Sequence, residues 1–391
     1  MTDELTRRQL LERAAMGGAA ITFPGILAAC GSSGSKASEG TTSVEQKLAK
    51  TLNFSNWTLY MDTKGKTFPS LEAFQKKTGV HVNYVEDIND NASFFAKIQG
   101  PLSRGQSIDR DIVVLTDNDR YLSLMIKKGW AEKLDKSAIP NMKNLVDVQK
   151  HPNFDPNRDY SLPWQSGMTG IAYNDTLTDP VLSVDDLLEA PKLKGKITVL
   201  NSMGDAMTLV MLSNGDDPTK VTDKTWNAAY SRIKKAVDDK QIRQFTGNDY
   251  APILAPGDLM AAMSWSGDIA QLGNKHIHWN VPEAGGALWT DNMLIPKGGD
   301  VYTASVYMNY VYDPKVQGAM EAGDPKRNIT GIYYIPPVKG AGEAAKQYDP
   351  AVAKNTLIFP TASMLSKVKI FDSKALNNQK YLEQWGNLVS G

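Results

Sequence analysis

Residues 68–128 alternate between helix and strand patterns, reading FPSLEAFQKKT (68–78), VHVNYV (80–85), NASFFAKIQGPLSR (91–104), DIVVL (111–115) and DRYLSLMIKK (119–128). Apolar residues recur every three or four positions in the first, third and fifth segments, as on one face of a helix, whereas the second and fourth segments are short apolar runs. Strands that alternate with helices of this length favour a mostly parallel sheet. The stretch therefore predicts an α/β fold.

The same alternation continues further along the chain. Residues 196–200, 259–265 and 288–295 are apolar runs that we expect to be strands, and residues 222–239 carry a helix pattern. Large apolar residues in this helix are spaced by four, three and four positions, which places them on one face and predicts that they pack into the core. They are Trp226, Tyr230, Ile233 and Val237. Ligands of such sheets bind outside the carboxyl ends of the strands.

Length and charge narrow the class of protein. The chain has 391 residues, of which 41% are hydrophobic, with 43 Lys and Arg against 43 Asp and Glu. A single core rarely organises more than roughly 250 to 300 residues, so we expect two lobes. A formal charge of zero provides no positive field to attract phosphates, which argues against a nucleic-acid partner.

The N-terminal residues have the pattern of an export signal. Arg7-Arg8-Gln9-Leu10 precedes an apolar, small-residue stretch (14–29), which is too short to span a membrane. The paired arginines resemble a twin-arginine export signal, and Leu27-Ala28-Ala29-Cys30-Gly31 resembles a bacterial lipobox. We therefore predict a signal peptide over 1–30, lipid on Cys30 at the outer face of the membrane, and a flexible Ser- and Gly-rich tether over 31–50.

Motifs for catalysis or cofactor binding are scarce. There is no Gly-x-Ser-x-Gly nucleophile motif and no phosphate-binding loop. His276-x-His278 has no third close ligand, so we interpret it as a solvent-facing pair. We expect no enzyme activity, no cofactor and no metal. A surface lipoprotein hydrolase stays open as an alternative, and a structure with Ser, His and an acid within hydrogen-bond reach would decide for it.

Aromatic and acidic residues instead follow the predicted strands. Trp57 to Tyr60, Thr116-Asp117, Gly204-Asp205, Trp265 and Trp289 to Asp291 all lie at or after strand ends. Aromatic faces attract cations and pack along methylene chains, while carboxylates compensate an ammonium group for its lost water. Together they suit an aliphatic cation. Individually, Asp205 could cap a helix, Trp289 could fill the core and Asp117 could form an Asx turn.

Several motifs, in order along residues 52–337, resemble one known family. They are Asn56-Trp57-Thr58, Tyr84-Val85-Glu86, residues 111–114, Lys128-Gly129, Pro163-Trp164 with residues 169–174, Trp265-Ser266-Gly267 and residues 285–291, which read Gly-Gly-Ala-Leu-Trp-Thr-Asp. The chain thereby resembles the substrate-binding proteins of bacterial spermidine/putrescine ABC transporters. The resemblance implies a two-lobed α/β periplasmic-binding-protein fold of type II, with a ligand cleft between lobes joined by hinge strands. It also implies a polyamine ligand and partner permease subunits in the membrane.

The resemblance carries the family's binding residues onto this sequence. Its aromatic platform falls on Trp57, Tyr60, Trp265 and Trp289, and its ammonium-binding acids fall on Asp205 and Asp291. The neighbouring Thr58, Thr116 and Asp117 complete the predicted binding set. Spermidine-binding members commonly carry acids where this chain has Leu59 and Thr208, and Thr116-Asp117-Asn118 replaces their Ser-x-Tyr. The number of ligand amines is therefore left open, with Asp117 as the acid most able to compensate.

The resemblance also predicts how the chain is divided. We expect a first lobe from 51–165 and 291–335, a second lobe from 166–290 and 336–391, and crossings near 164–170, 285–291 and Ile335. We expect the protein to act as a monomer. A different cargo stays open, either an amino-acid-like cation or a ferric ion, for which Tyr333-Tyr334 would be candidate ligands. Pro336-Pro337 follows this pair, so we prefer to interpret both tyrosines as turn packing.

Overall fold

The computed structural model describes residues 46–390, which belong to one compact unit. The predicted signal peptide, its Cys30 and most of the predicted tether lie outside the described residues. The last part of that tether, residues 46–50, differs from the prediction: Leu48 packs against the core, and the backbone N–H of Ala49 donates to Thr303 Oγ1 (2.8 Å). Residues 46–50 are therefore held by the folded part of the chain, through an apolar contact and a hydrogen bond. The predicted tether extends too far at its C-terminal end.

The predicted alternation of helices and strands is confirmed in the first lobe. Its elements are β1 (Thr51–Trp57), α2 (Pro69–Thr78), β2 (His81–Ile88), α3 (Asn91–Ser103), β3 (Ile112–Thr116) and α4 (Arg120–Lys127). α3 and α4 each begin after an aspartate, Asp90 and Asp119, whose side chain accepts a hydrogen bond from a first-turn backbone N–H. Such caps satisfy backbone donors that have no partner within the helix.

The second lobe repeats the pattern. Its elements are α5 (Val184–Glu189), β5 (Ile197–Leu200), α6 (Met203–Ser213), α7 (Asp223–Asp238), β6 (Ile242–Thr246), α8 (Ala251–Leu254), β7 (Ala261–Trp265), α9 (Ser266–Leu272) and β8 (Ile277–Asn280). The predicted strands at 196–200 and 259–265 and the helix at 222–239 are confirmed. On α7, Trp226 and Ile233 are fully buried, while Tyr230 and Val237 are half-buried against the same core.

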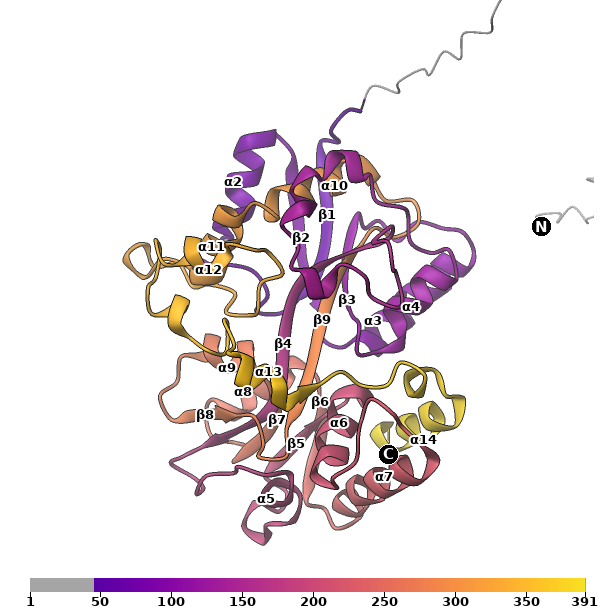
Figure 1. Ribbon diagram of the computed structural model, residues 1–391, viewed down its shortest axis with the longest axis vertical. Coiled ribbons are helices and arrows are strands. Elements are labelled where there is room, and N and C mark those ends of the chain that lie inside the picture. The colour runs from indigo at the N-terminus through magenta and orange to yellow at the C-terminus, as the bar shows by residue number, and fades with distance from the viewer. Residues whose placement is uncertain (1–45, 391) are drawn as a thin grey trace, which may run out of the picture. The chain divides into compact units, whose positions relative to one another are not determined.

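Two long strands, β4 (Ser161–Asn174) and β9 (Gly286–Leu294), run antiparallel through the middle of the sheet (Figure 1). The sheet order is β2-β1-β3-β9-β4-β7-β5-β6, with β8 paired to β4. β1 pairs in parallel with β2 and β3, and β5 pairs in parallel with β6 and β7. β4 and β9 therefore join the two groups of parallel strands, and the predicted crossings at 164–170 and 285–291 lie in or beside these two strands.

The crossing strands also position the site. Gly167 lies opposite Trp289, and a Cβ at Gly167 would come within 2.4 Å of the Trp289 ring. The absence of a side chain at this position lets the indole pack directly against β4. The predicted lobe boundaries at 165 and 291 fall within β4 and β9, which belong to both lobes.

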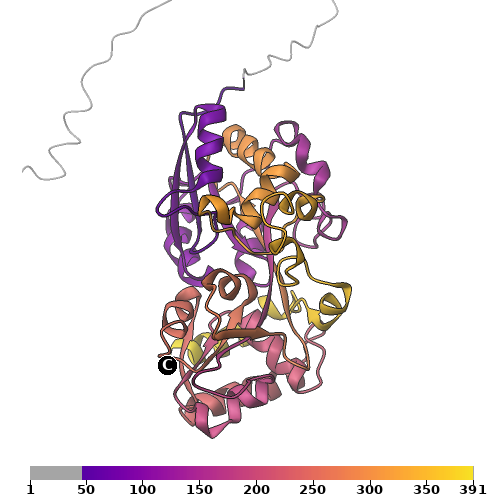
Figure 2. The same ribbon diagram turned by 90° about the vertical axis from the view of Figure 1, so that its left-hand side faces the viewer.

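The C-terminal part of the chain departs from the predicted division. It contains α10 (Val301–Val311), α11 (Pro314–Ala322), α12 (Ala341–Ala345), α13 (Ala362–Lys367), β10 (Val368–Lys369) and α14 (Gln379–Ser390). The predicted division assigns all of 336–391 to the second lobe, but α12 packs on α11, where Gly318 allows Ala344 to come close. Within this C-terminal part, β10 is the strand that pairs with the second-lobe end of β9, and Val368 lies opposite Gly286. Figure 2 shows this C-terminal segment descending from the first lobe to the second.

No helix within residues 46–390 has both the length and the apolar character needed to cross a membrane.

Candidate ligand-binding site

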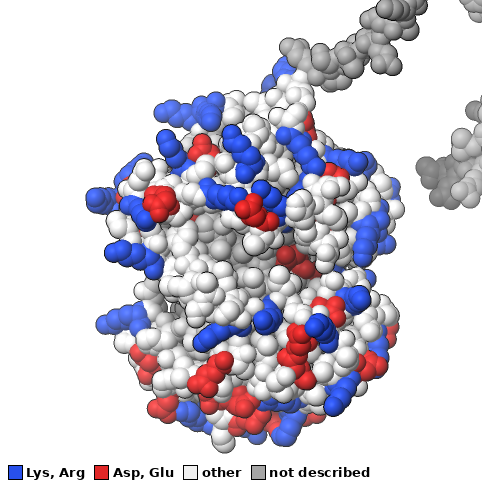
Figure 3. All heavy atoms as spheres, viewed as in Figure 1, with Lys and Arg blue, Asp and Glu red and all other residues white. Residues whose placement is uncertain are grey.

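A cavity of about 330 Å³ opens between the two lobes. Figure 3 shows atoms of acidic residues inside the hollow that separates the upper and lower halves of the described residues. Eight of the buried lining residues are here called the aromatic chamber: Trp57, Tyr60, Thr116, Asp205, Trp265, Trp289, Asp291 and Tyr334. All of them except Tyr334 are predicted site residues, and predicted Thr58 lines the same cavity.

The remaining lining residues include a more exposed set, here called the rim. Asp90, Ala92, Ser93, Asp119 and Tyr121 come from the N-terminal ends of α3 and α4, and Leu382, Trp385, Val389 and Ser390 come from α14. Except for the buried Trp385, these residues are half-buried or exposed. The rim therefore contains first-lobe carboxylates and second-lobe apolar side chains.

Asp291 is held by two hydroxyl groups. β3 and β9 are antiparallel, with Thr116 directly opposite Asp291, and Thr116 Oγ1 donates to Asp291 Oδ1 over 2.6 Å. The Tyr60 hydroxyl donates to Asp291 Oδ2 over 2.7 Å. Burial, with smaller contributions from the charges of Asp117 and Asp205, raises the pKa of Asp291 to about 7, although the two hydroxyl bonds lower it. Two hydroxyl donors do not replace the lost water, so this carboxylate is suited to bind a cation.

Asp205 lies in the first turn of α6, where it could have been only a helix cap. The cap is instead Ser202, whose Oγ accepts from the Asp205 backbone N–H. The Asp205 carboxylate accepts from Thr169 Oγ1 (2.5 Å), from Asn118 Nδ2 of the first lobe (3.0 Å) and from Trp265 Nε1 (3.4 Å). Burial raises its pKa although these bonds lower it. Asp205 is therefore a second buried carboxylate, linked across the cleft.

The aromatic side chains form a continuous series of contacts. Ring centroids are 5.8 Å apart for Trp57 and Trp265, 6.2 Å for Trp265 and Trp289, and 5.7 Å for Trp289 and Tyr334. Trp289 Nε1 donates to Thr169 Oγ1 over 3.0 Å. Trp289 thus lines the cavity and does not only fill the core. Indole and phenol faces of this kind bind methylene chains and cations.

Asp117 does not line the cavity, unlike the other predicted site residues. Its Oδ1 accepts from the Thr290 backbone N–H over 2.8 Å, linking β3 to β9 on the other side of the strand from Thr116. The predicted role of Asp117 as a compensating acid is therefore not supported by its position, because consecutive strand residues point to opposite faces. Leu59 and Thr208 do not line the cavity either, and Thr208 Oγ1 donates to the Gly204 carbonyl.

Tyr334 is not only turn packing, and here the structure corrects the interpretation from sequence. Its ring lines the cavity, and its hydroxyl donates to Asp268 Oδ1 over 2.6 Å. Asp268 Oδ2 accepts from the Tyr250 hydroxyl (2.6 Å) and Asn248 Nδ2 (2.9 Å). Gly267 leaves the room that the Tyr334 ring needs, since a Cβ there would lie 2.3 Å from it. This network anchors the chamber wall from behind.

Sequence reasoning also misses the rim and several amides. The missed lining residues are Asp90, Asn91, Ala92, Ser93, Asn118, Asp119, Tyr121, Asn201, Ser202, Asn248, Tyr334, Leu382, Trp385, Gly386, Val389 and Ser390. The spacing of Leu382, Trp385 and Val389 by three and four does predict one helix face, but such a face is usually core. Asp90 and Asp119 carry only the signal of an N-cap.

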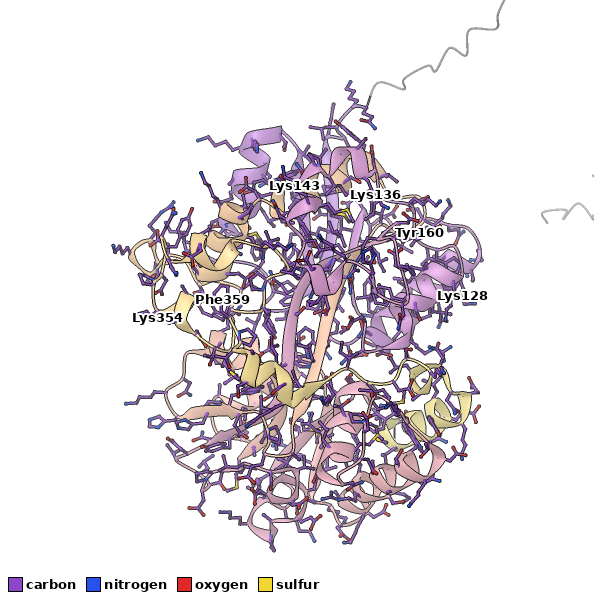
Figure 4. The ribbon with its side chains drawn as sticks, viewed as in Figure 1. Lys128, Lys136, Lys143, Tyr160, Lys354 and Phe359 are labelled. Carbon is purple, nitrogen blue, oxygen red and sulfur yellow. The ribbon has the colours of Figure 1, made fainter. Side chains whose placement is uncertain are left out.

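Over the part of the chain that the structure describes, the cavity wall has no cationic side chain. No Lys or Arg is among the described residues that line it. Lys128 and Lys354, labelled in Figure 4, lie at opposite edges of the view. Over residues 46–390 no group of His, Cys, Asp and Glu is arranged to hold a metal ion. The charge of the cavity wall is therefore carried by carboxylates.

Comparisons with known proteins agree with this geometry. The chain is 27% identical over 348 residues to the spermidine/putrescine-binding periplasmic protein of Escherichia coli (strain K12), covering 87% of this chain and 92% of that protein. It is 30% identical over 387 residues to the putrescine-binding periplasmic protein PotF of the same organism, covering 90% and 94%. The solved structure of the Tp0655 (TpPotD) lipoprotein of Treponema pallidum matches with a TM-score of 0.69 at 20% identity, covering 87% and 100%.

The structural match confirms the predicted type II periplasmic-binding-protein fold. The profile of bacterial extracellular solute-binding proteins matches residues 70–360. This match confirms the predicted family and the prediction of a binding protein, since the members bind solutes for ABC transporters and are not enzymes. The chain belongs to the bacterial extracellular solute-binding protein family.

Proposed function

We propose that this protein captures a polyamine between its lobes for uptake by an ABC importer. The observation that carries the proposal is the pair of buried carboxylates, Asp205 and Asp291, in an aromatic cavity whose described lining residues include no Lys or Arg. The relatives named for spermidine and putrescine support the same class of ligand. Trp57, Thr58, Tyr60, Thr116, Trp265 and Trp289 complete the proposed binding set.

The chemistry of an aliphatic diammonium ion fits these side chains. Each ammonium group has three donors and no acceptor, and each buried carboxylate keeps lone pairs beyond those used by its hydroxyl and amide partners. The faces of Trp265 and Trp289 cover the methylene chain between the charges. In this arrangement Asp205 and Asp291 each bind one ammonium group.

Calorimetric titration of the purified chain tests the ligand class. Putrescine and spermidine should bind with heat and raise the unfolding temperature, because a ligand that binds only the folded state stabilises it. L-lysine, L-arginine and Fe(III) serve as competing cargoes. Saturable binding of one of these, with no heat from either polyamine, would overturn the polyamine proposal while leaving the family assignment intact.

Closure of the lobes is part of the proposal. The Asn118 amide already donates to Asp205 across the cleft, so a bound cation between the same two lobes would favour the closed form. We propose that the closed, monomeric protein is then recognised by permease subunits of the transporter. Small-angle scattering should show a smaller radius of gyration at saturating polyamine than without it, and an unchanged radius would argue against closure on the ligand.

Lipid anchoring is proposed from the sequence of residues 1–30. Replacing Arg7 and Arg8 with Lys should block export, and Cys30→Ala should release the exported protein from the membrane fraction. Retention of the Cys30→Ala variant on the membrane would contradict the anchor. The polyamine proposal does not depend on this result, because the binding residues all lie beyond the tether.

A further inference from the structure

We propose that the rim holds an additional ammonium group, so that the ligand of this protein is a triamine or longer rather than a diamine. This inference rests on the proposed function, because it assumes that the aromatic chamber binds one end of a polyamine. The chamber contains two carboxylates, and a diamine that pairs with both leaves no charge to reach the rim. Any group that contacts the rim must therefore come from a longer ligand.

Two carboxylates are available at the rim. Asp90 Oδ1 accepts from the Ser93 backbone N–H over 2.7 Å, and Asp119 Oδ1 accepts from the Arg120 backbone N–H over 2.7 Å. Within residues 46–390 neither aspartate forms an ion pair with a Lys, Arg or His side chain, although both line the cavity. Desolvation, Asp205 and Asp90 raise the pKa of Asp119 to about 7, although the backbone N–H and the charge of the adjacent Arg120 lower it, and a ligand cation would lower it further.

A separate observation points to a missing donor beside these acids. Asn118 lines the cavity, is 2% exposed and uses its Nδ2 to bond Asp205. Its Oδ1 has no hydrogen-bond partner among the described residues. Buried carbonyl oxygens are nearly always paired, so this atom is available to accept a hydrogen bond from a bound ligand. An ammonium group beside Asn118 and Asp119 supplies that donor and has two more for the rim carboxylates.

The opposite wall of the rim fits the intervening methylene groups. Leu382, Trp385 and Val389 lie on one face of α14 and line the cavity. The Trp385 ring is fixed by its Nε1, which donates to the Asn201 carbonyl over 2.8 Å. Tyr121 lines the cavity from α4. A chain leaving the chamber thus has apolar side chains along its length and carboxylates at its end, which is the pattern that a longer polyamine requires.

The test uses two ligands of equal length that differ in one charge. Spermidine carries a third amine, which N-butylputrescine replaces with a methyl group. The Asp90→Asn/Asp119→Asn double variant keeps both helix caps, because Asn caps as well as Asp. The parent should bind spermidine about tenfold or more tightly than N-butylputrescine, and the double variant should lose most of that difference while binding putrescine within about twofold of the parent.

Asp313→Asn is the matched control, since Asp313 caps α11 in the first lobe and does not line the cavity. It should preserve the difference between the two ligands. If the double variant also preserves that difference, or if putrescine and spermidine weaken in parallel, the rim site is overturned and the proposed function stands. If the parent binds no polyamine, both the rim site and the proposed function are wrong.

Discussion

The aromatic chamber and the rim are built from different parts of the fold. Chamber side chains lie on or next to the crossing strand β9 and the strand ends, and they are buried and hydrogen-bonded to one another, as Tyr60 and Thr116 are to Asp291. Rim carboxylates sit at helix N-termini and are bonded only within their own first turns. The chamber is therefore fixed by the fold, whereas the rim can vary without disturbing it. We infer that the chamber sets the class of ligand and the rim its length.

Removing a chamber carboxylate should have the largest effect. Asp205→Ala and Asp291→Ala should each weaken polyamine binding by about 2 to 5 kcal/mol, because a buried ammonium group keeps its desolvation cost and loses its partner. Calorimetry with putrescine measures the loss, and Asp→Asn variants separate charge from packing. If Asp90→Asn costs putrescine affinity as much as these variants do, the distinction between chamber and rim is wrong.

The interface between the lobes should be nearly as sensitive. A Cβ at Gly204 would lie 2.2 Å from the backbone oxygen of Asn118 in the first lobe, so Gly204→Ala should hold the lobes apart and weaken binding by about 1 to 3 kcal/mol. The unfolding temperature of the ligand-free chain should not fall, since Ala favours the α6 helix over Gly.

Gly100→Ala is the control for this effect. Gly100 also lies inside a helix, α3, and its Cβ would meet only the Arg104 side chain at 3.6 Å. It should leave affinity unchanged. Scattering should report a larger radius for ligand-saturated Gly204→Ala than for ligand-saturated Gly100→Ala, and equal radii would contradict the proposed obstruction of closure.

Binding should depend on pH through the chamber. The pKa of Asp291 is about 7 in the folded protein without ligand, and a cation requires the ionised form, so binding below pH 7 must release a proton. Affinity for putrescine should fall about tenfold between pH 8 and pH 6. Calorimetric titrations in two buffers of different ionisation enthalpy should detect the released proton at pH 6. The Asp291→Asn variant should show a weaker dependence of putrescine affinity on pH.

The raised pKa of Asp291 has the opposite effect on the stability of the ligand-free protein, which falls as the pH rises. The folded pKa of Asp291 is raised above its ordinary value of 3.8, so its contribution to stability is fully present below that value and is lost as pH rises through about 7. Polyamine should therefore raise the unfolding temperature more at pH 8 than at pH 5.5. A larger rise at pH 5.5 would be inconsistent with an ionised Asp291 as the cation's partner.

Trimming one chamber ring should cost less than removing a carboxylate. Trp265→Phe keeps an aromatic face but removes the indole Nε1 that lies 3.4 Å from Asp205, so we expect a loss of about 1 kcal/mol in putrescine binding. Trp279→Phe is the matched control, because Trp279 lies on β8 and does not line this cavity. Equal losses would indicate a general effect on the second lobe.

The smallest effect is expected at Asp117. Asp117→Asn should leave putrescine and spermidine affinity within about twofold, because an Asn Oδ1 can still accept from the Thr290 backbone N–H outside the cavity. A tenfold loss would restore Asp117 to the binding site and weaken the case for the rim acids.

The sequence by itself determined the architecture and most of the chamber. Helices and strands follow from local periodicity, which α2 to α4 and β2 to β3 carry within about sixty residues. Aromatic and acidic residues at strand ends meet at one edge of a parallel sheet, so the order of residues along the chain is enough to group Trp57, Asp205 and Trp265. The choice between Thr116 and Asp117 is also within reach of the sequence, because neighbouring strand residues point to opposite faces.

Only the tertiary structure decided the rim, Tyr334 and the division of the C-terminal segment. Asp90 and Asp119 look like ordinary helix caps, and the α14 face looks like ordinary core, until β4 and β9 bring the two lobes together. Tyr334 turns toward Asp268, which is 66 residues away, because Gly267 leaves space for its ring. Such contacts depend on the register of strands distant in the chain, and local sequence patterns do not contain that information.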